Sequence, residues 1–419
     1  MLAMSAIPVF WGWRVVLAAF TVLTVIYGLQ FSFGVLLPAI ARDLDWRLST
    51  LAAPFSLYIF IYTALSFFTG RLTDRIGPLW VIRVGAVCLA AGYGSMALTE
   101  TVWEPYLYLC VFAALGAGAA FVPCNATVIK WFVDRRGLAL GVAGSGISVA
   151  ALVGPPLTAL LLTRFDWRDT LVLLAIGAVV LLLAAAQFMV RDPESVGQRP
   201  YRVADAGTPL TLTGLTLSQA WRTRTFWLLM MVLFFTWLVI FIPFVHLPGL
   251  GAERGLDVSS SAMLIALAGV GGIAGRLFGG PGSDRLGRKA GLAVAIGAQA
   301  SGLYCLSISF EFAWLGVWAF VFGLGYSGVS VMFPALLGDL FGRAHSGAIV
   351  GFVFASVGSA AAAGPYAASL VFDATGSLQG AFHGAALVNL VALMLLVFLR
   401  VPRIRFEDRQ ARGTAYDGA

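Results

Sequence analysis

The chain has 419 residues, of which 60% are hydrophobic and only 11% carry a formal charge. A soluble globular protein carries roughly a quarter charged residues, so this composition excludes an ordinary soluble fold. The mean hydropathy of +0.90 is typical of a helical protein that lies within a lipid bilayer.

Twelve apolar runs follow one another along the chain, each about 20 residues long, which is the length that crosses a bilayer core of ~30 Å. The predicted spans cover about 15–41, 48–70, 77–99, 105–129, 137–163, 170–190, 225–250, 258–280, 290–310, 312–338, 346–372 and 378–399. We therefore expect an all-α membrane protein with twelve transmembrane helices.

Lysine and arginine are distributed unevenly over the predicted loops. If the N-terminus is cytoplasmic, 21 of the 27 basic residues lie on inner loops and tails and five on outer loops, whereas the 20 acidic residues divide evenly. This bias is the positive-inside pattern. It predicts a multi-pass protein of the cell inner membrane with both termini in the cytoplasm. The net charge of +7 then reflects membrane topology, and we expect no nucleic-acid partner.

A polar stretch at 191–224 divides the spans six and six, and the two halves repeat each other. The loop at 70–77 (GRLTDRIG) recurs at 280–287 (GPGSDRLG), and Gly154-Pro155 recurs as Gly364-Pro365, both 210 residues later. Parallel six-helix halves are typical of a secondary transporter with its substrate site between them. The predicted parts are a bundle over 1–190, a cytoplasmic linker over 191–224, a second bundle over 225–402 and a cytoplasmic tail over 403–419.

The first of these loops resembles the hallmark cytoplasmic motif of the major facilitator superfamily, Gly-x-Leu-x-Asp-Arg-x-Gly. The resemblance implies that superfamily's fold, in which two pseudo-symmetric six-helix bundles enclose a central cavity. In this loop an acidic side chain near a helix end and its basic neighbours latch adjacent helices on the cytoplasmic side. The expected gating residues are Asp74, Arg75, Asp284 and Arg285.

The segment 131–146 (WFVDRRGLALGVAGSG) resembles the fourth-to-fifth-helix signature of the monocarboxylate transporter family. Asp134 departs from that signature, and Gly12-Trp13 matches the family's first signature only in part. The chain thus resembles a bacterial member of this family, with relatives among oxalate/formate antiporters.

Arg276 is the one charged residue deep within an apolar run, between AMLIALAGVGGIAG and LFGGPGS. A guanidinium stays charged at any accessible pH. It costs roughly 3 kcal/mol or more in hydrocarbon, so such residues usually face a water-filled cavity and meet an anion there. The alternative is that Arg276 reaches along its helix to the lipid headgroups. The resemblance favours anion binding, because it aligns Arg276 with the arginine that binds the substrate carboxylate.

Other polar side chains lie on spans that line the cavity in this superfamily. His246 is flanked by Pro243 and Pro248 and titrates near physiological pH. We expect it either to carry the coupling proton or to support a broken helix end. The expected substrate contacts are Asn125, Tyr326, Tyr27 and Gln30, and the weaker candidates are Tyr58, Tyr62, Ser356 and Tyr366.

Departures from the relatives limit what can be transferred. Animal-type members carry an Asp four residues before the arginine, where this chain has Gly272, and a first-helix lysine, whereas 15–38 contains none. Oxalate/formate antiporters carry a lysine in helix 11, but 346–372 contains no Lys or Arg. One buried cation predicts a substrate with one carboxylate.

The sequence therefore predicts a secondary active transporter of small monocarboxylates, similar to lactate or pyruvate, that is proton-coupled and works by alternating access. The alternatives are an organic-anion exchanger, an efflux carrier for aromatic acids, and a non-transporting membrane receptor for a small acid. We expect no enzyme, because the chain has no nucleophile–base arrangement and no phosphate-binding loop. The expected partners are the anion, the proton and the bilayer, with no cofactor, metal or obligate protein partner.

Overall fold

The structure is a computed structural model that describes residues 10–132, 136–199, 201, 214–341 and 346–399. The first half contains α1 (Gly12–Asp43), α2 (Leu48–Ile76), α3 (Pro78–Met96), η1 (Tyr106–Ala113), α4 (Ala114–Gly118), α5 (Phe121–Trp131), α6 (Arg136–Leu162) and α7 (Trp167–Ala186). The short η2 (Glu194–Val196) and α8 (Leu217–Trp221) follow. The second half contains α9 (Arg224–Leu238), α10 (Phe241–Glu253), α11 (Val258–Leu286), α12 (Arg288–Ile308), α13 (Phe312–Phe341), α14 (Ser346–Thr375) and α15 (Gln379–Phe398).

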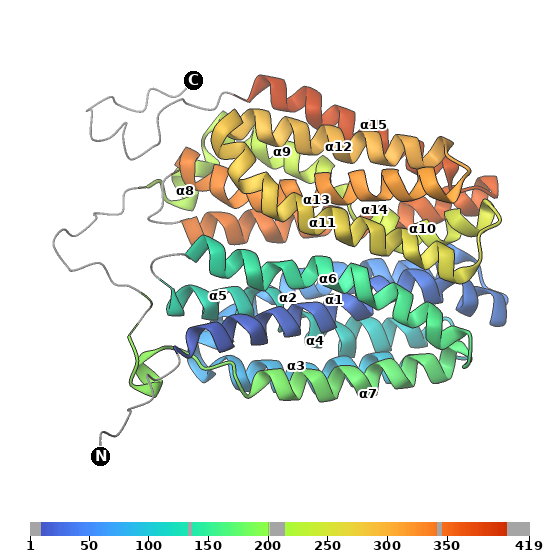
Figure 1. The fold of residues 1–419 in the computed structure, drawn as a ribbon, viewed down its shortest axis with the longest axis horizontal. Helices are drawn as coiled ribbons and strands as arrows, with labels where there is room; N and C mark the ends of the chain where they lie inside the picture. The colour runs from blue at the N-terminus through green and yellow to red at the C-terminus, as the bar shows by residue number, and fades with distance from the viewer. Residues whose placement is uncertain (1–9, 133–135, 200, 202–213, 342–345, 400–419) are drawn as a thin grey trace, which may run out of the picture.

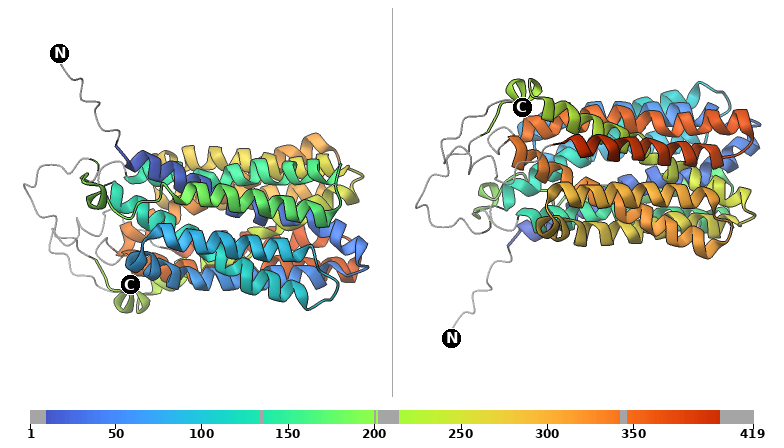
Figure 2. Two further views of the ribbon diagram at one scale, coloured as in Figure 1. Left: turned by 90° about the horizontal axis from the view of Figure 1, so that it is seen from below. Right: turned by 90° about the horizontal axis from the view of Figure 1, so that it is seen from above.

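The helices run nearly parallel to one long axis and form two groups (Figure 1), with α1–α7 on one side and α9–α15 on the other. Figure 2 shows the same long bundle from two further directions. Within the described residues, eleven segments are long and apolar enough to cross a membrane. The 30-residue α14 occupies the place of the remaining predicted span. The predicted all-helical architecture is thus confirmed, whereas the division at 190, 224 and 402 stays a prediction, and the tail 403–419 lies outside the described residues.

Two predicted spans are broken, and a proline explains each break. The fourth span consists of η1, α4 and α5, with an interruption at Ala119–Ala120, and the seventh consists of α9 and α10, with an interruption at Val239–Ile240. Pro123 and Pro243 follow the first residue of each interruption by four positions. A proline ring clashes with the carbonyl four residues earlier and cannot donate to it. Each break therefore coincides with a proline, whereas α1, α2 and α14 continue through Pro38, Pro54 and Pro365.

We call the end of the bundle at which α1 begins and α15 ends the terminal face, and the opposite end the distal face. Close to the distal face, α1 of the first half packs tightly on α10 of the second. The Phe31 and Phe244 rings are stacked with centroids 4.3 Å apart. A Cβ on Gly34 would lie 2.9 Å from the Val245 carbonyl oxygen and closer still to that of Phe244. The two halves therefore close the space between them on its distal side.

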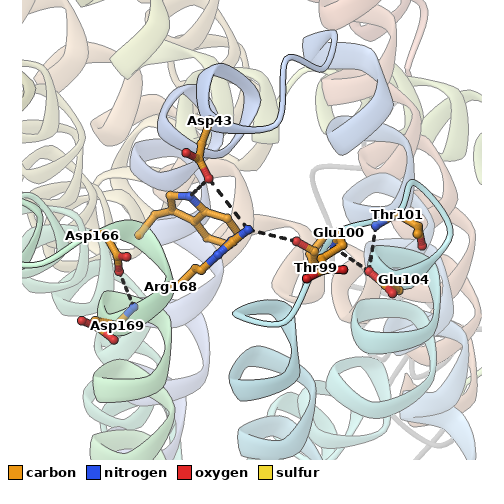
Figure 3. Close-up of polar contacts among 9 residues, drawn as sticks. Asp43, Thr99, Glu100, Thr101, Glu104, Asp166, Arg168 and Asp169 are labelled. Carbon is orange, nitrogen blue, oxygen red and sulfur yellow. Dashed lines mark hydrogen bonds and ion pairs between the residues drawn. The ribbon is translucent and has the colours of Figure 1, made fainter.

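Polar contacts hold the first half together at the distal face (Figure 3). The indole N–H of Trp167 donates to Asp43 (2.9 Å), and Arg168 lies 3.9 Å from the same carboxylate and donates to the Thr99 carbonyl (3.4 Å). Nearby, the backbone N–H groups of Glu100 and Thr101 donate to Glu104 and lower the pKa of its carboxyl. The ends of α1, α3 and α7 are thereby joined, which suits a half that moves as one body.

Candidate functional site

Polar side chains from both halves gather halfway between the two faces. Four helices each contribute one such side chain near their middle: Tyr27 lies on α1, Tyr62 on α2, Ser148 on α6 and Tyr326 on α13. Tyr27 lies within electrostatic reach of Tyr62, Tyr326 and Arg276, which places groups from four helices around one point. A site at this level has the depth at which secondary transporters bind substrate between their repeats.

Arg276 points from α11 towards α6 of the other half. Its Nε–H donates to Ser148 Oγ (3.1 Å), and its Nη1 lies 3.2 Å from where a Cβ on Gly144 would be. The next two residues face outward, with Leu277 63% and Phe278 72% exposed, whereas Arg276 is partly buried. The guanidinium thus lies at the contact between the halves rather than along the lipid-facing side of its helix. Among the described residues, no carboxylate forms an ion pair with it.

Across from the guanidinium, α1 and α2 contribute hydroxyl and amide groups. Gln30 Nε2 donates to the Tyr62 hydroxyl (3.5 Å), and Gln30 Oε1 is buried with no partner among the described residues. Buried polar groups normally have partners, so the free amide oxygen is available to a hydrogen-bond donor on a bound molecule or a water.

Two serines meet beside Gly272, one helical turn from Arg276. A Cβ on Gly272 would lie 2.9 Å from both Ser148 Oγ and Ser327 Oγ. Ser148 comes from α6 and Ser327 from α13, and both are buried. Sequence reasoning noticed Gly272 as a departure from relatives but missed both serines, because small hydroxyl residues are common in membrane helices.

Aromatic rings surround this polar centre. On the distal side, the Tyr326 ring packs on Phe244 (5.4 Å between centroids) and Phe322 (6.3 Å). Towards the terminal face, Phe121 of the first half stacks on Phe354 of the second at 4.9 Å. Rings from both halves thus lie on either side of the charged group, as expected for a small site that binds an anion with a short apolar tail.

Comparison with known proteins gives the family. The family model described as Major Facilitator Superfamily matches residues 19–306 and 250–415. These matches extend over most of the chain. The chain belongs to the Major Facilitator Superfamily.

Relatives within the superfamily cover nearly the whole chain. Monocarboxylate transporter 11 of Homo sapiens is 29% identical over 94% of this chain and 83% of its own length. The Mus musculus protein of the same name is 30% identical over 89% of this chain and 83% of its own length. The oxalate:formate antiporter of Oxalobacter formigenes is 25% identical over 94% and 92%. This Major Facilitator Superfamily chain is thus a transporter relative rather than an enzyme, as the sequence predicted.

The superfamily's loop motif lies at the terminal face, as expected from its position in the sequence. Arg75 and Arg285 are exposed there, and the side chains of Asp74 and Asp284 lie outside the described residues. A different ion pair links two helices at this face, and we call it the latch. Arg288 donates through Nε to Asp339 (3.0 Å) and through Nη1 to Ser283 Oγ (2.7 Å). This pair joins the start of α12 to the end of α13. The sequence signal was Arg288 within GPGSDRLGR, but Asp339 had no motif to mark it.

His246 makes its described hydrogen bonds within the second half. It is buried on α10, and its Nε2 lies 2.9 Å from the Pro365 carbonyl oxygen and 3.2 Å from Ser369 Oγ, both on α14. Pro365 is one of the repeated Gly-Pro residues, and its carbonyl oxygen also accepts from Ser369 Oγ (3.0 Å). These contacts hold α10 against α14 within the second half.

The other candidates are divided between local contacts and the lipid-facing surface. Asn125 donates to the Phe121 carbonyl of its own helix (2.9 Å), and Ser356 does the same to Phe352 (2.9 Å). Tyr58 is fully buried beside Tyr62, with ring centroids 5.2 Å apart, and Tyr366 is exposed. Of the four expected substrate contacts besides Arg276, the structure gathers Tyr27, Gln30 and Tyr326 at the centre.

Proposed function

We propose that this chain is a secondary active transporter of small monocarboxylates, similar to lactate or pyruvate, with Arg276 as the residue that binds the carboxylate. One observation carries the proposal: a partly buried guanidinium at mid-depth reaches across the two halves and donates to a serine hydroxyl, with no carboxylate partner among the described residues. A planar guanidinium matches a carboxylate with two parallel hydrogen bonds. The relatives named monocarboxylate transporters support this substrate class.

Alternating access follows from where these contacts lie. The Arg276–Ser148 hydrogen bond joins α11 to α6, so it breaks or shifts whenever the halves rock apart. A bound carboxylate offers the guanidinium a stronger partner than a neutral hydroxyl, because charge-assisted hydrogen bonds are roughly twice as strong. The anion thereby favours a different arrangement of the two halves, which is the differential binding that a transport cycle requires.

We propose that the terminal face is cytoplasmic and that the protein lies in the cell inner membrane. The proposal rests on the positive-inside distribution of Lys and Arg. The 191–224 linker should then be labelled only from the cytoplasmic side when single cysteines are introduced into it. Labelling of the linker by an impermeant reagent added to intact cells would overturn this orientation.

We further propose that transport is coupled to protons. The middle of the described spans has no Asp or Glu, so the carrier is either His246 or the occupied Arg276 site itself. His246 can exchange a proton near neutral pH in water, although its Nε2 contacts the Pro365 carbonyl. An anion exchanger needs no proton carrier. Exchange is the second candidate function, because one relative is named an oxalate:formate antiporter.

Uptake by proteoliposomes tests the proposed function. The purified protein is reconstituted and offered radiolabelled acids of two to six carbons, with and without an inward proton gradient. We expect accumulation of small monocarboxylates that depends on the gradient and is lost in Arg276→Ala. Exchange without gradient-driven accumulation would support the exchanger, and binding without any flux would support a receptor. Equal uptake by Arg276→Ala and the unmodified protein would overturn the assignment of the site.

A further inference from the structure

Ser327 carries a hydroxyl that the fold itself does not use. It is fully buried on α13, and its Oγ has no hydrogen-bond partner within the part of the chain that the structure describes. Serines in apolar helices usually donate to the carbonyl one turn earlier. Ser330, on the same helix, does so to Tyr326 (3.0 Å), and Ser369 does so to Pro365 (3.0 Å). The free hydroxyl of Ser327 therefore marks a place where a partner is expected.

Gly272 lets that hydroxyl and a second one approach the backbone of α11 closely. The missing Cβ of Gly272 would lie 2.9 Å from both Ser327 Oγ and Ser148 Oγ, so two hydroxyls from different halves converge on one bare stretch of α11. Positions four apart on a helix share a face, which places this stretch directly beside Arg276. Ser148 Oγ already accepts from Arg276 Nε, and its own proton remains available for donation.

We propose that Ser327, together with Ser148, binds an oxygen on the carbon next to the substrate carboxylate, so that 2-hydroxy and 2-oxo acids are preferred over the unsubstituted acid. The inference rests on the proposed function, in which Arg276 holds the carboxylate. An oxygen on the adjacent carbon then lies beside the guanidinium, on the side where the two hydroxyls approach Gly272. Both serine hydroxyls can donate to it, and a 2-hydroxyl group can in turn donate to Ser327.

The preference comes from the cost of leaving a buried hydroxyl unpaired. An acid without the second oxygen leaves Ser327 without a partner, and a site built to bond a substrate hydroxyl discriminates strongly against the analogue that lacks it. Ser327 and Gly272 lie in the second half, and the internal repeat does not reproduce them in the first. The position 210 residues before Ser327 is Ala117, and the position 210 residues before Gly272 is Tyr62. The pseudo-symmetric fold thus does not require a serine or a glycine at these places.

A pair of three-carbon acids tests the proposal: 2-hydroxypropanoate (lactate) and propanoate, which differ only in the hydroxyl. Initial uptake rates into proteoliposomes are measured for both, and liposomes with Arg276→Ala correct for passive permeation. In Ser327→Ala we expect the ratio of kcat/KM for the hydroxy acid over propanoate to fall about tenfold, the effect of one hydrogen bond, with propanoate little changed. Ser330→Ala is the matched control on the same helix and should leave the ratio unchanged.

Gly272→Ala is an independent variant if Ser327→Ala is poorly produced. Its methyl group would lie 2.9 Å from both hydroxyls and would displace them, so the hydroxy acid should lose more rate than propanoate. An unchanged ratio in both variants, or an equal loss for both acids, would overturn the inference and leave Arg276 binding intact. If the unmodified protein takes up neither acid above the Arg276→Ala background, the proposed function fails, and this inference fails with it.

Discussion

Replacing Gly34 by alanine should hold the two halves apart at the distal face. Gly34 lies on α1 against the backbone of α10, where a Cβ would be 2.9 Å from the Val245 carbonyl oxygen and 3.0 Å from the Val245 Cα. These neighbours are backbone atoms, so no side chain can rotate away to make room. Overpacking of this kind costs about 1–3 kcal/mol. At 1.4 kcal/mol per tenfold, the distal-closed state should lose roughly 5- to 150-fold in population relative to the distal-open state.

The effect is measured as accessibility from the distal side. In a variant whose four cysteines, Cys88, Cys110, Cys124 and Cys305, are replaced by alanine, Gln30→Cys serves as a reporter at the central site. We expect Gly34→Ala to raise its rate of labelling by an impermeant maleimide and to lower substrate uptake. Gly28→Ala is the control on the same helix, because a Cβ there meets nothing within 4 Å.

The outcome separates a gate from a folding defect. Faster labelling with intact insertion shows that the α1–α10 contact closes the distal side. Unchanged labelling in Gly34→Ala, with uptake equal to that of the Gly28→Ala control, would refute the reasoning, because the contact would then not limit access to the site.

Three further predictions follow from the site and the latch. Arg276→Lys should keep the charge but lose one of two parallel hydrogen bonds to the carboxylate, each worth about 1.5–3 kcal/mol. The KM for the acid should therefore rise by roughly 10- to 150-fold. An unchanged KM in uptake assays would contradict binding through two hydrogen bonds. If His246 carries the proton, His246→Gln should abolish gradient-driven accumulation and spare exchange without a gradient, whereas equal loss of both indicates support of the α10–α14 contact. Arg288→Gln and Asp339→Asn should each lower thermal stability. The double variant should lose less stability than the sum of the two single losses, with a coupling of about 1 kcal/mol. Additive losses of stability would show that the pair is not a latch.

Several properties of this protein follow from its sequence without any tertiary information. The apolar runs predict the membrane helices because a bilayer requires a minimum length of apolar residues. The superfamily could be identified because GRLTDRIG and GPGSDRLG form the polar ends of α2 and α11, where they stand out against the apolar spans. Arg276 stood out for the same reason: a charge within hydrocarbon is costly and therefore informative. Pro123 and Pro243 were visible in the sequence, but only the structure shows that the helices break near them and continue through Pro38, Pro54 and Pro365.

Only the tertiary structure decided which way the helices face. In a soluble protein, polar and apolar faces show how a helix is rotated, but lipid and protein interior are both apolar, so the pattern of a membrane helix says little about its rotation. This is why Ser148, Ser327 and the Phe31–Phe244 stack had no signal in the sequence. It is also why His246, which lies on a predicted cavity-lining span, turned out to face Pro365 within its own half. The contacts of Arg276 with Ser148 and Gly144 join residues about 130 positions apart, and only the packing of the two halves brings them together.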